Sequence, residues 1–285
     1  MVDNESFQNT IKSAILISGI GLFTGEKVKL TIHPAAVDSG IIFKRVDLLD
    51  KPILKADLNL VKETDRQTLV GFGKKSIQTV EHLMSALAAY NIDNVLIEID
   101  GSEIPIYDGS SKAFASFLEN NILAQEKKAE IFKVEKPIYF SENNTHLVAL
   151  PSDEYKISFT LDHPNSDFIK SQYFSYLVDE KTYLKEISPA RTFSIYEEIK
   201  PLLDNNLIKG GSLDNAVLIK DNKVMNDGGV RFANEMVRHK ILDLMGDLKL
   251  LSKRFLAHII AIRSGHLTNI KFAKKIDAHF KEGNN

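Results

Sequence analysis

The chain contains no cysteine among its 285 residues. Disulfide bonds, thiolate zinc sites and a thiol nucleophile are therefore excluded. The formal net charge is only −2 at pH 7, so we expect no nucleic-acid partner, because such proteins normally carry a concentrated basic surface. No apolar run approaches the roughly 20 residues of a membrane span. The first ten residues also lack the basic and apolar regions of a signal peptide. These absences lead us to expect a cytoplasmic protein with no integral membrane segment.

The pattern of apolar residues predicts strands and helices in both halves of the chain. Alternation predicts strands at residues 14–17, 27–32, 40–44, 94–100, 132–134, 146–150, 155–160, 173–177, 183–187, 216–220 and 258–263. Helical periodicity predicts helices at residues 80–90, 112–120, 193–203, 234–251 and 267–281. Both halves therefore run strands, helix, strand, helix, which predicts an α+β fold of two similarly built domains. The polar junction near residues 126–130 divides them into residues 1–127 and 128–285.

One predicted helix, RFANEMVRHKILDLMGDLKLL (231–251), carries four ionisable residues on a narrow wedge. With His239 at zero, Asp243 lies at about 40°, Asp247 at about 80° and Lys240 at about 100° around the helix. A His and an Asp four residues apart are neighbours that can present a nitrogen and an oxygen to one metal ion. The alternative is an ordinary amphipathic helix with this face in water. His and Asp are poor helix formers, and Gly246 costs about another 1 kcal/mol relative to Ala, which favours a functional face.

Three further segments place polar residues at the ends of predicted elements. In QTVEHLMSALAAY, Thr79 is a plausible N-cap, and Glu81 and His82 occupy the first helical turn, where the helix dipole favours neutral imidazole. In IAIRSGHLTN, His266 follows a strand and a glycine turn, a position that suits functional and structural histidines equally. In SPARTFSI, Thr192 lies where a predicted strand gives way to a helix, and an N-cap is the simpler interpretation.

Together these segments resemble one known family over nearly the whole chain. The matching motifs are TVEHL, ARTF, HKxxDxxGDL and SGH, in this order, and their combination is far more specific than any one of them. On these motifs the chain resembles the UDP-3-O-acyl-N-acetylglucosamine deacetylases, the zinc amidases of lipid A biosynthesis in Gram-negative bacteria. The resemblance implies an active site between the two domains. It also implies hydrolysis of the N-acetyl group of an acylated UDP-sugar, which releases acetate and the free amine.

The resemblance implies a metal centre made by His82, His239 and Asp243, with water at an open fourth position. One Zn(II) ion per chain is expected there, and this ligand set also accepts Fe(II). Bound zinc lowers the pKa of its water to about 7. Glu81 is implied as the general base that removes a proton from this water.

Further residues are implied to act on the substrate. His266, oriented by Asp247, would stabilise the oxyanion or protonate the departing amine, and Thr192 would donate its hydroxyl to the oxyanion. Lys240 would bind the substrate and Phe193 would pack on the sugar. An insert over residues 195–218 would form an apolar passage for the acyl chain, although an amphipathic helix with a core face explains the same pattern. The remaining implied substrate contacts are Ile195, Tyr196, Ile199, Gly211 and Ser212.

The chain departs from the family pattern in three places. Phe23 stands where members usually have His, the segment ETDRQTL (63–69) lacks a frequent cysteine, and Thr145 or His146 stands where a basic residue is typical. We expect the second change to alter metal sensitivity and not to abolish activity. We expect a monomer, with peripheral membrane contact through the acyl chain compatible with the sequence. Two alternatives stay open: a zinc hydrolase acting on another acylated amine, and a non-catalytic sugar-nucleotide or lipid-binding module.

Overall fold

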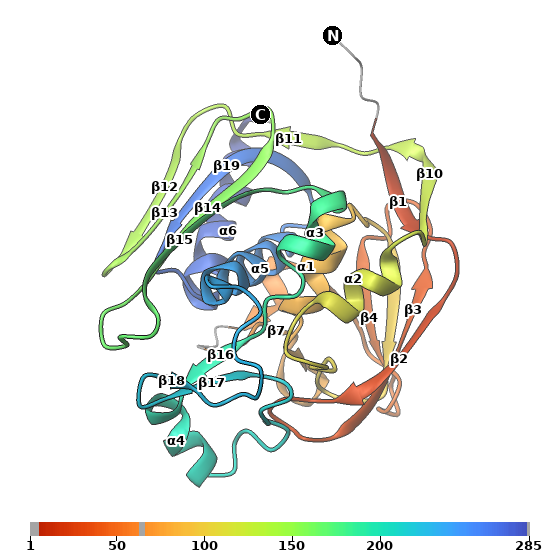
Figure 1. Cartoon of the computed structure of the whole chain (residues 1–285). Helices are drawn as coiled ribbons and strands as arrows, with labels where there is room; N and C mark the ends of the chain where they lie inside the picture. Colours follow the sequence, from red (N-terminus) through yellow and green to blue (C-terminus); the bar gives the residue numbers. More distant parts are fainter. Residues whose placement is uncertain (1–5, 63–65, 284–285) are drawn as a thin grey trace.

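The computed structural model describes residues 6–62 and 66–283 (Figure 1). We predicted that the cysteine missing from segment 63–69 changes the sensitivity of the protein to metal. Residues 63–65 of that segment lie outside the described residues. Two β-sheets lie on opposite sides of a group of helices, and the helices α1 (Glu81–Ala89) and α5 (Glu235–Lys249) lie at its centre (Figure 1). The α+β class predicted from the sequence is confirmed.

The first half of the chain forms a five-stranded sheet, a small three-stranded sheet and a two-stranded ribbon. Its strands are β1 (Phe7–Ile11), β2 (Ile15–Ile20), β3 (Lys27–Pro34), β4 (Ile41–Arg45), β5 (Ile53–Lys55), β6 (Val61–Lys62), β7 (Leu69–Val70), β8 (Ile77–Gln78), β9 (Val95–Ile99) and β10 (Ile122–Lys128). Besides α1, this half contains α2 (Lys112–Leu118). The strand β10 pairs with β1, and neither strand of this ribbon was predicted.

The second half forms a six-stranded sheet and a small three-stranded sheet. Its strands are β11 (Ile131–Lys133), β12 (Ile138–Glu142), β13 (Thr145–Leu150), β14 (Tyr155–His163), β15 (Lys170–Leu177), β16 (Phe193–Ile195), β17 (Val217–Lys220), β18 (Lys223–Val224) and β19 (Arg254–Ile262). Besides α5, its helices are α3 (Glu180–Glu186), α4 (Tyr196–Asp204) and α6 (His266–Gly283). Among residues 6–62 and 66–283, none of these helices combines the length and apolar character needed to cross a bilayer.

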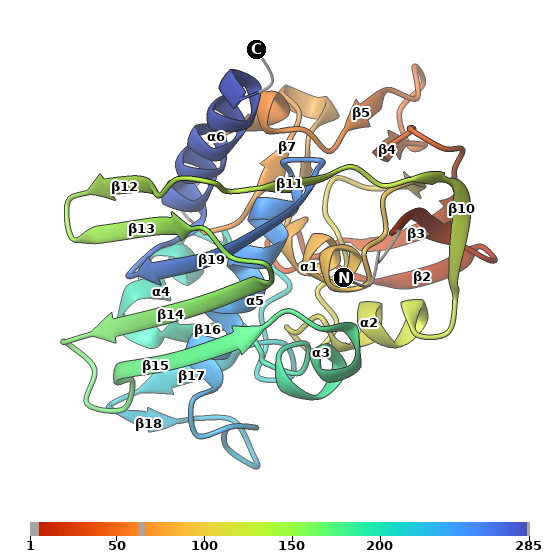
Figure 2. The same cartoon turned by 90° about the horizontal axis from the view of Figure 1, so that it is seen from above.

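The two large sheets share one strand order, which explains why the two halves of the sequence look alike. The order is β2-β3-β9-β4-β5 in the first sheet and β12-β13-β19-β14-β15 in the second, so the fifth strand is central in both. It runs parallel to the third strand, as β9 does to β4 and β19 to β14. The helix before that central strand is α1 in one half and α5 in the other. Figure 2 shows the chain crossing this face of the molecule from β10, beside the first sheet, through β11 to the second sheet.

Three local predictions were wrong. Residues 183–187 were predicted as a strand, but residues 183–186 belong to α3 and Ile187 is its C-cap, because the Asp179 side chain accepts a hydrogen bond from the Lys181 backbone N–H and starts a helix. The predicted helix at 193–203 begins only at Tyr196, since the first three residues pair with β17 as strand β16. Thr79 is not an N-cap: the cap position of α1 is Val80, and no side chain caps it.

Candidate active site

Three of the four side chains in the polar wedge of α5 are buried, and Lys240 is partly exposed. His239, Asp243 and Asp247 are 2%, 3% and 0% exposed, so the ordinary amphipathic-helix interpretation is wrong. Gly246 permits close packing of α5 on α1, because a Cβ atom there would lie 2.1 Å from the Glu81 backbone oxygen. The glycine that weakens the helix therefore allows α5 to lie directly against the first turn of α1.

His82, His239 and Asp243 form a cluster whose ligand atoms all lie within 4.8 Å of one another. The Asp243 Oδ1 atom lies 3.2 Å from Nε2 of His239 and 3.8 Å from Nε2 of His82. This buried oxygen has no hydrogen-bond partner among the described residues. A buried carboxylate oxygen facing two imidazole nitrogens is costly unless a cation binds there, so these residues fit a metal ion of the zinc type.

The protonation of the cluster suits metal binding. His239 Nδ1 lies 3.1 Å from the Ala190 carbonyl oxygen, which selects the tautomer whose Nε2 lone pair faces the cluster. Burial, reinforced by the neighbouring His239, lowers the pKa of His82 to about 3, so His82 is neutral. Burial alone would raise the pKa of Asp243, but His239 and Lys240 hold it well below its usual value. The cluster thus presents the neutral imidazole of His82, Nε2 of His239 and an anionic oxygen of Asp243.

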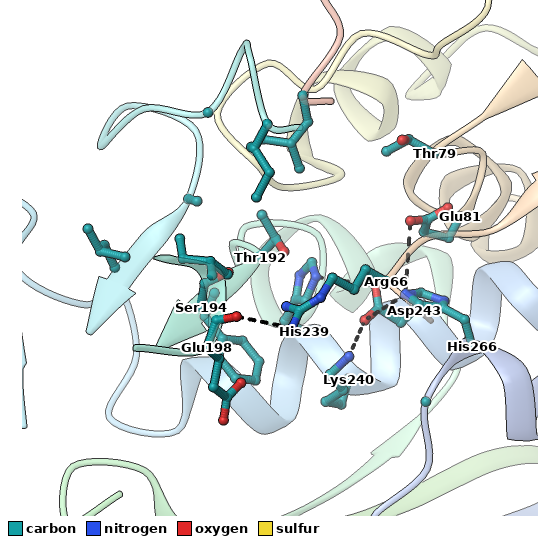
Figure 3. Close-up of a pocket in the computed structure, with 18 of the residues that line it drawn as sticks. Arg66, Thr79, Glu81, Thr192, Ser194, Glu198, His239, Lys240, Asp243 and His266 are labelled. Atoms are coloured by element: carbon teal, nitrogen blue, oxygen red, sulfur yellow. Dashed lines mark hydrogen bonds and ion pairs between the residues drawn. The ribbon is translucent and has the colours of Figure 1, made fainter. Parts of the chain in front are cut away.

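A carboxylate and an imidazole, those of Glu81 and His266, lie beside this cluster (Figure 3). His266 Nε2 lies 4.0 Å from Oε1 of Glu81 and 3.8 Å from Oδ2 of Asp243. Its Nδ1 lies 2.9 Å from Oδ2 of Asp247, as expected for an orienting carboxylate. Burial, strengthened by Asp247 and Asp243 and opposed by His266, raises the pKa of Glu81 to about 8. Burial alone would lower the pKa of His266, but the surrounding carboxylates raise it to about 9.

Lys240, Thr192 and Phe193 complete the rim of the site. Lys240 Nζ donates to Asp243 Oδ2 at 2.8 Å and lies 5.9 Å from the Phe193 ring centre. Thr192 precedes β16 and is held by its backbone, whose N–H donates to the Gly109 oxygen at 2.7 Å. It follows helix α3 and precedes a strand, so the N-cap interpretation of Thr192 is wrong. Figure 3 shows Thr192 across the cavity from Glu81 and His266.

These groups open into a cavity of about 740 Å³. Of the predicted substrate contacts, Lys240, Phe193, Ile199, Gly211 and Ser212 line it. Apolar side chains from α4 and the following loop extend the wall, namely Leu203, Ile208 and Leu213.

Two predicted contacts lie outside the wall of this cavity. Ile195 packs against the hydrophobic core, and the Tyr196 ring faces Lys220, whose Nζ lies 4.7 Å from the ring centre. Both side chains are therefore occupied by other parts of the protein. As substrate contacts, Ile195 and Tyr196 stay predictions.

The structure adds residues that the sequence did not single out. The buried Glu103 accepts hydrogen bonds from the backbone N–H groups of Phe23 and Thr24, and lies 3.0 Å from the Thr79 hydroxyl. Phe23 itself lines the cavity, and its carbonyl accepts from the Lys209 N–H of the insert. Thr68 contacts both Glu81 and Asp247. No periodicity or spacing marks Thr68 or Glu103, because both act through contacts distant in the sequence.

The remaining departures from the family pattern lie near the cavity mouth. The Thr145 hydroxyl donates to the Arg263 carbonyl at 3.1 Å, and Arg263 lines the cavity. His146 is exposed, with Nδ1 2.9 Å from the Ser141 hydroxyl. Arg263 therefore supplies a basic side chain in the region where Thr145 and His146 do not.

Comparison with known proteins gives a consistent result. A family model described as "LpxC: UDP-3-O-acyl N-acetylglycosamine deacetylase" matches residues 8–278. The chain is 45% identical over 273 residues to the UDP-3-O-acyl-N-acetylglucosamine deacetylase of Chlamydia caviae, covering 95% of this chain and 97% of that protein. It is 44% identical over 274 residues to the same enzyme of Chlamydia pneumoniae, with the same coverage. The enzyme of Chlamydia trachomatis serovar L2 is 41% identical over 270 residues, 94% of each chain.

Proposed function

Because the chain belongs to the UDP-3-O-acyl N-acetylglycosamine deacetylase family, we propose that it removes the acetyl group of UDP-3-O-acyl-N-acetylglucosamine in lipid A biosynthesis. The products are acetate and UDP-3-O-acyl-glucosamine. One observation carries this assignment: a buried His, His, Asp cluster lies beside an acid–base pair at the base of a cavity with an apolar wall. A module that only binds its ligand has no need of that acid–base pair.

We propose that His82, His239 and Asp243 hold one Zn(II) ion per chain, with Fe(II) as an accepted substitute. Such an ion, when bound, activates water as a nucleophile at neutral pH and polarises the amide carbonyl. The unpartnered Oδ1 of Asp243 and the neutral His82 support this ligand set.

The protein side chains then divide the proton transfers. Glu81 accepts a proton as water attacks the acetamide carbonyl carbon, and the neighbouring His266 favours the ionised carboxylate that this role needs. His266, protonated and held by Asp247, faces the developing oxyanion and donates a proton to the departing amine. The Thr192 hydroxyl donates a hydrogen bond to the oxyanion from the opposite wall. The C–N bond breaks, and the amine leaves as the free 2-amino group.

The substrate is proposed to lie between the rim and the apolar wall. Lys240 binds a polar group of the substrate near the metal centre, and Phe193 packs on the sugar. The 3-O-acyl chain follows the insert over residues 195–218, past Ile199, Gly211 and Ser212, which line the cavity.

Several broader expectations also stay proposals. We propose a cytoplasmic monomer that contacts the membrane only peripherally, through the acyl chain of its substrate. We also propose two domains, residues 1–127 and 128–285, the first contributing Glu81 and His82 and the second the other site residues. The shared strand order of the two large sheets supports this division.

The test is acetate release by the purified protein from UDP-3-O-acyl-N-acetylglucosamine and from the matched substrate without the 3-O-acyl chain. We expect release that depends strongly on the acyl chain, stops with a chelator and returns with Zn(II). Equal release from both substrates would indicate a hydrolase of another acylated amine. No release from a protein shown to contain metal would indicate a binding module.

A further inference from the structure

We infer that Thr68 is a positioning residue that links the general base to the carboxylate orienting the general acid. Its backbone holds Glu81, and its hydroxyl holds Asp247 and, through Asp247, the imidazole of His266. This inference rests on the proposed function, because it assigns Thr68 a part in that reaction.

Thr68 is fully enclosed and contacts three members of the site. It is 1% exposed and immediately precedes strand β7. Its backbone N–H donates to Glu81 Oε2 at 3.0 Å. Its Oγ1 donates to Asp247 Oδ1 at 2.5 Å and lies 3.2 Å from Nδ1 of His266. The segment containing Thr68 thus joins α1, α5 and the first turn of α6.

The hydrogen bonds around Asp247 define what the hydroxyl does. One carboxylate oxygen of Asp247 faces His266 Nδ1 at 2.9 Å and accepts from the Asn269 amide at 2.8 Å. The other oxygen accepts from Thr68 alone among the hydrogen bonds found in the described residues. Asp247 is 0% exposed, so water cannot replace that donor without rearrangement. The Thr68 hydroxyl therefore fixes the rotation of the carboxylate that in turn orients the imidazole.

The Thr68 hydroxyl also helps to place a hydrogen on Nδ1 of His266, the ring nitrogen that faces Asp247. A hydroxyl has one hydrogen, and the short contact assigns it to the carboxylate, which only accepts. The Thr68 oxygen and Asp247 Oδ2 are then both acceptors facing Nδ1 of His266, so Nδ1 carries a hydrogen. Nε2 of His266 is left to face Glu81 and the metal cluster.

A substitution series separates positioning from packing. Thr68→Val keeps the branching and nearly the size of the side chain and the N–H bond to Glu81, and replaces only the hydroxyl with a methyl group. Thr68→Ser keeps the hydroxyl and removes the methyl group. We expect Thr68→Val to lower kcat about 10-fold or more with little change in KM, as for other residues that orient a catalytic group. We expect Thr68→Ser to stay within about 3-fold of wild type, since an oriented donor remains.

A double-mutant cycle tests whether Thr68 acts through Asp247. In the Asp247→Ala background, Thr68→Val should change kcat by less than about 2-fold, because residues acting as one unit are not additive. Equal losses in both backgrounds would overturn the inference. So would wild-type kcat in Thr68→Val, or a Thr68→Ser variant as slow as Thr68→Val. Melting temperature and metal content, measured on each variant, identify a loss that comes from unfolding or an empty site.

A measurement that needs no turnover distinguishes this inference from the proposed function. The Nδ1–H proton of His266 should give a low-field NMR signal in the metal-free protein, assigned by its loss in His266→Gln. We expect Thr68→Val to shift this signal and speed its exchange with water, and Thr68→Ser to preserve it. An unchanged signal in Thr68→Val overturns the inference. Absence of acetate release by the wild-type protein counts against the proposed function alone.

Discussion

Replacing Gly246 by alanine tests whether the contact between α1 and α5 sets the geometry of the site. The added Cβ would lie 2.1 Å from the backbone oxygen of Glu81, 2.8 Å from its carbonyl carbon and 2.9 Å from its Cα. All three atoms are backbone atoms of the first turn of α1, so no flexible side chain can move aside. Since ordinary contact begins near 3.4 Å, the helices must separate by more than about 1 Å.

That separation moves Glu81 and His82 away from His239 and Asp243. A misplacement of about 1 Å in a catalytic site can cost on the order of 100-fold in rate, which corresponds to about 2.7 kcal/mol of activation free energy. Alanine also favours the helix by about 1 kcal/mol relative to glycine. This gain partly offsets the loss of stability caused by the displaced helices, so the melting temperature reports the displacement poorly. The values of kcat and metal affinity report it directly.

The assay compares kcat, bound metal and melting temperature in wild type, Gly246→Ala and a control substitution on another helix. Lys274→Ala is a suitable control, because Lys274 is exposed on α6. We expect Gly246→Ala to lower kcat about 100-fold and to weaken metal binding, and the control to match wild type. Wild-type kcat together with full metal content in Gly246→Ala would refute the claim that this contact positions the site.

Three other predictions follow from the described contacts. Glu81→Ala and His266→Ala should each lower kcat by about 10²–10⁴-fold, and Asp247→Ala should lower it by about 10–100-fold. Steady-state acetate release measures kcat for all three variants. A wild-type rate in any of them would remove that residue from the mechanism. The raised pKa of His266 means that the folded state holds this proton more tightly than the unfolded chain. Its stabilisation is complete below about pH 6.5 and is lost as pH rises through about 9, so the melting temperature of the metal-free protein should fall over that range and fall less in His266→Gln. Ile199→Trp should narrow the apolar wall and raise KM for the acylated substrate about 10-fold but leave KM for the non-acylated one unchanged; equal effects on both would contradict the proposed passage.

Regular patterns made part of this molecule predictable from sequence. The four-residue spacing on α5 placed His239 and Asp243 together, because helical geometry alone brings them onto one face. The spacing also placed Asp247 near them, and the structure brings all three into one buried region. Glu81 and His82 lie on a separate helix, so no spacing relates them to α5. Their place in the site was implied only by the family resemblance.

Long-range contacts explain what was missed. Thr68 forms a hydrogen bond with Asp247, which lies 179 positions away in the sequence, and no local pattern predicts such a contact. We predicted a strand at residues 183–187, but Tyr183 is buried with its hydroxyl bonded to Ser85 and Ser111, so tertiary packing favours the helix. The strand β1 is stabilised by its partner β10, more than a hundred residues later, and its own sequence gives little indication of pairing.

The helices α1 and α5 precede the central strands of the two large sheets, and each helix supplies part of the metal-ligand cluster. Binding of an ion is therefore coupled to the stability of the folded protein. His82 is presented by the first half of the chain, and His239 and Asp243 by the second, so an ion bound by all three ties the two halves together across their shared helix contact. Neither half alone retains the full ligand set, so the affinity for the ion is coupled to the association of the halves. At an ion concentration 100 times its dissociation constant, the folded protein gains about 2.7 kcal/mol. Chelation should therefore loosen the contact between the halves before it disturbs either sheet.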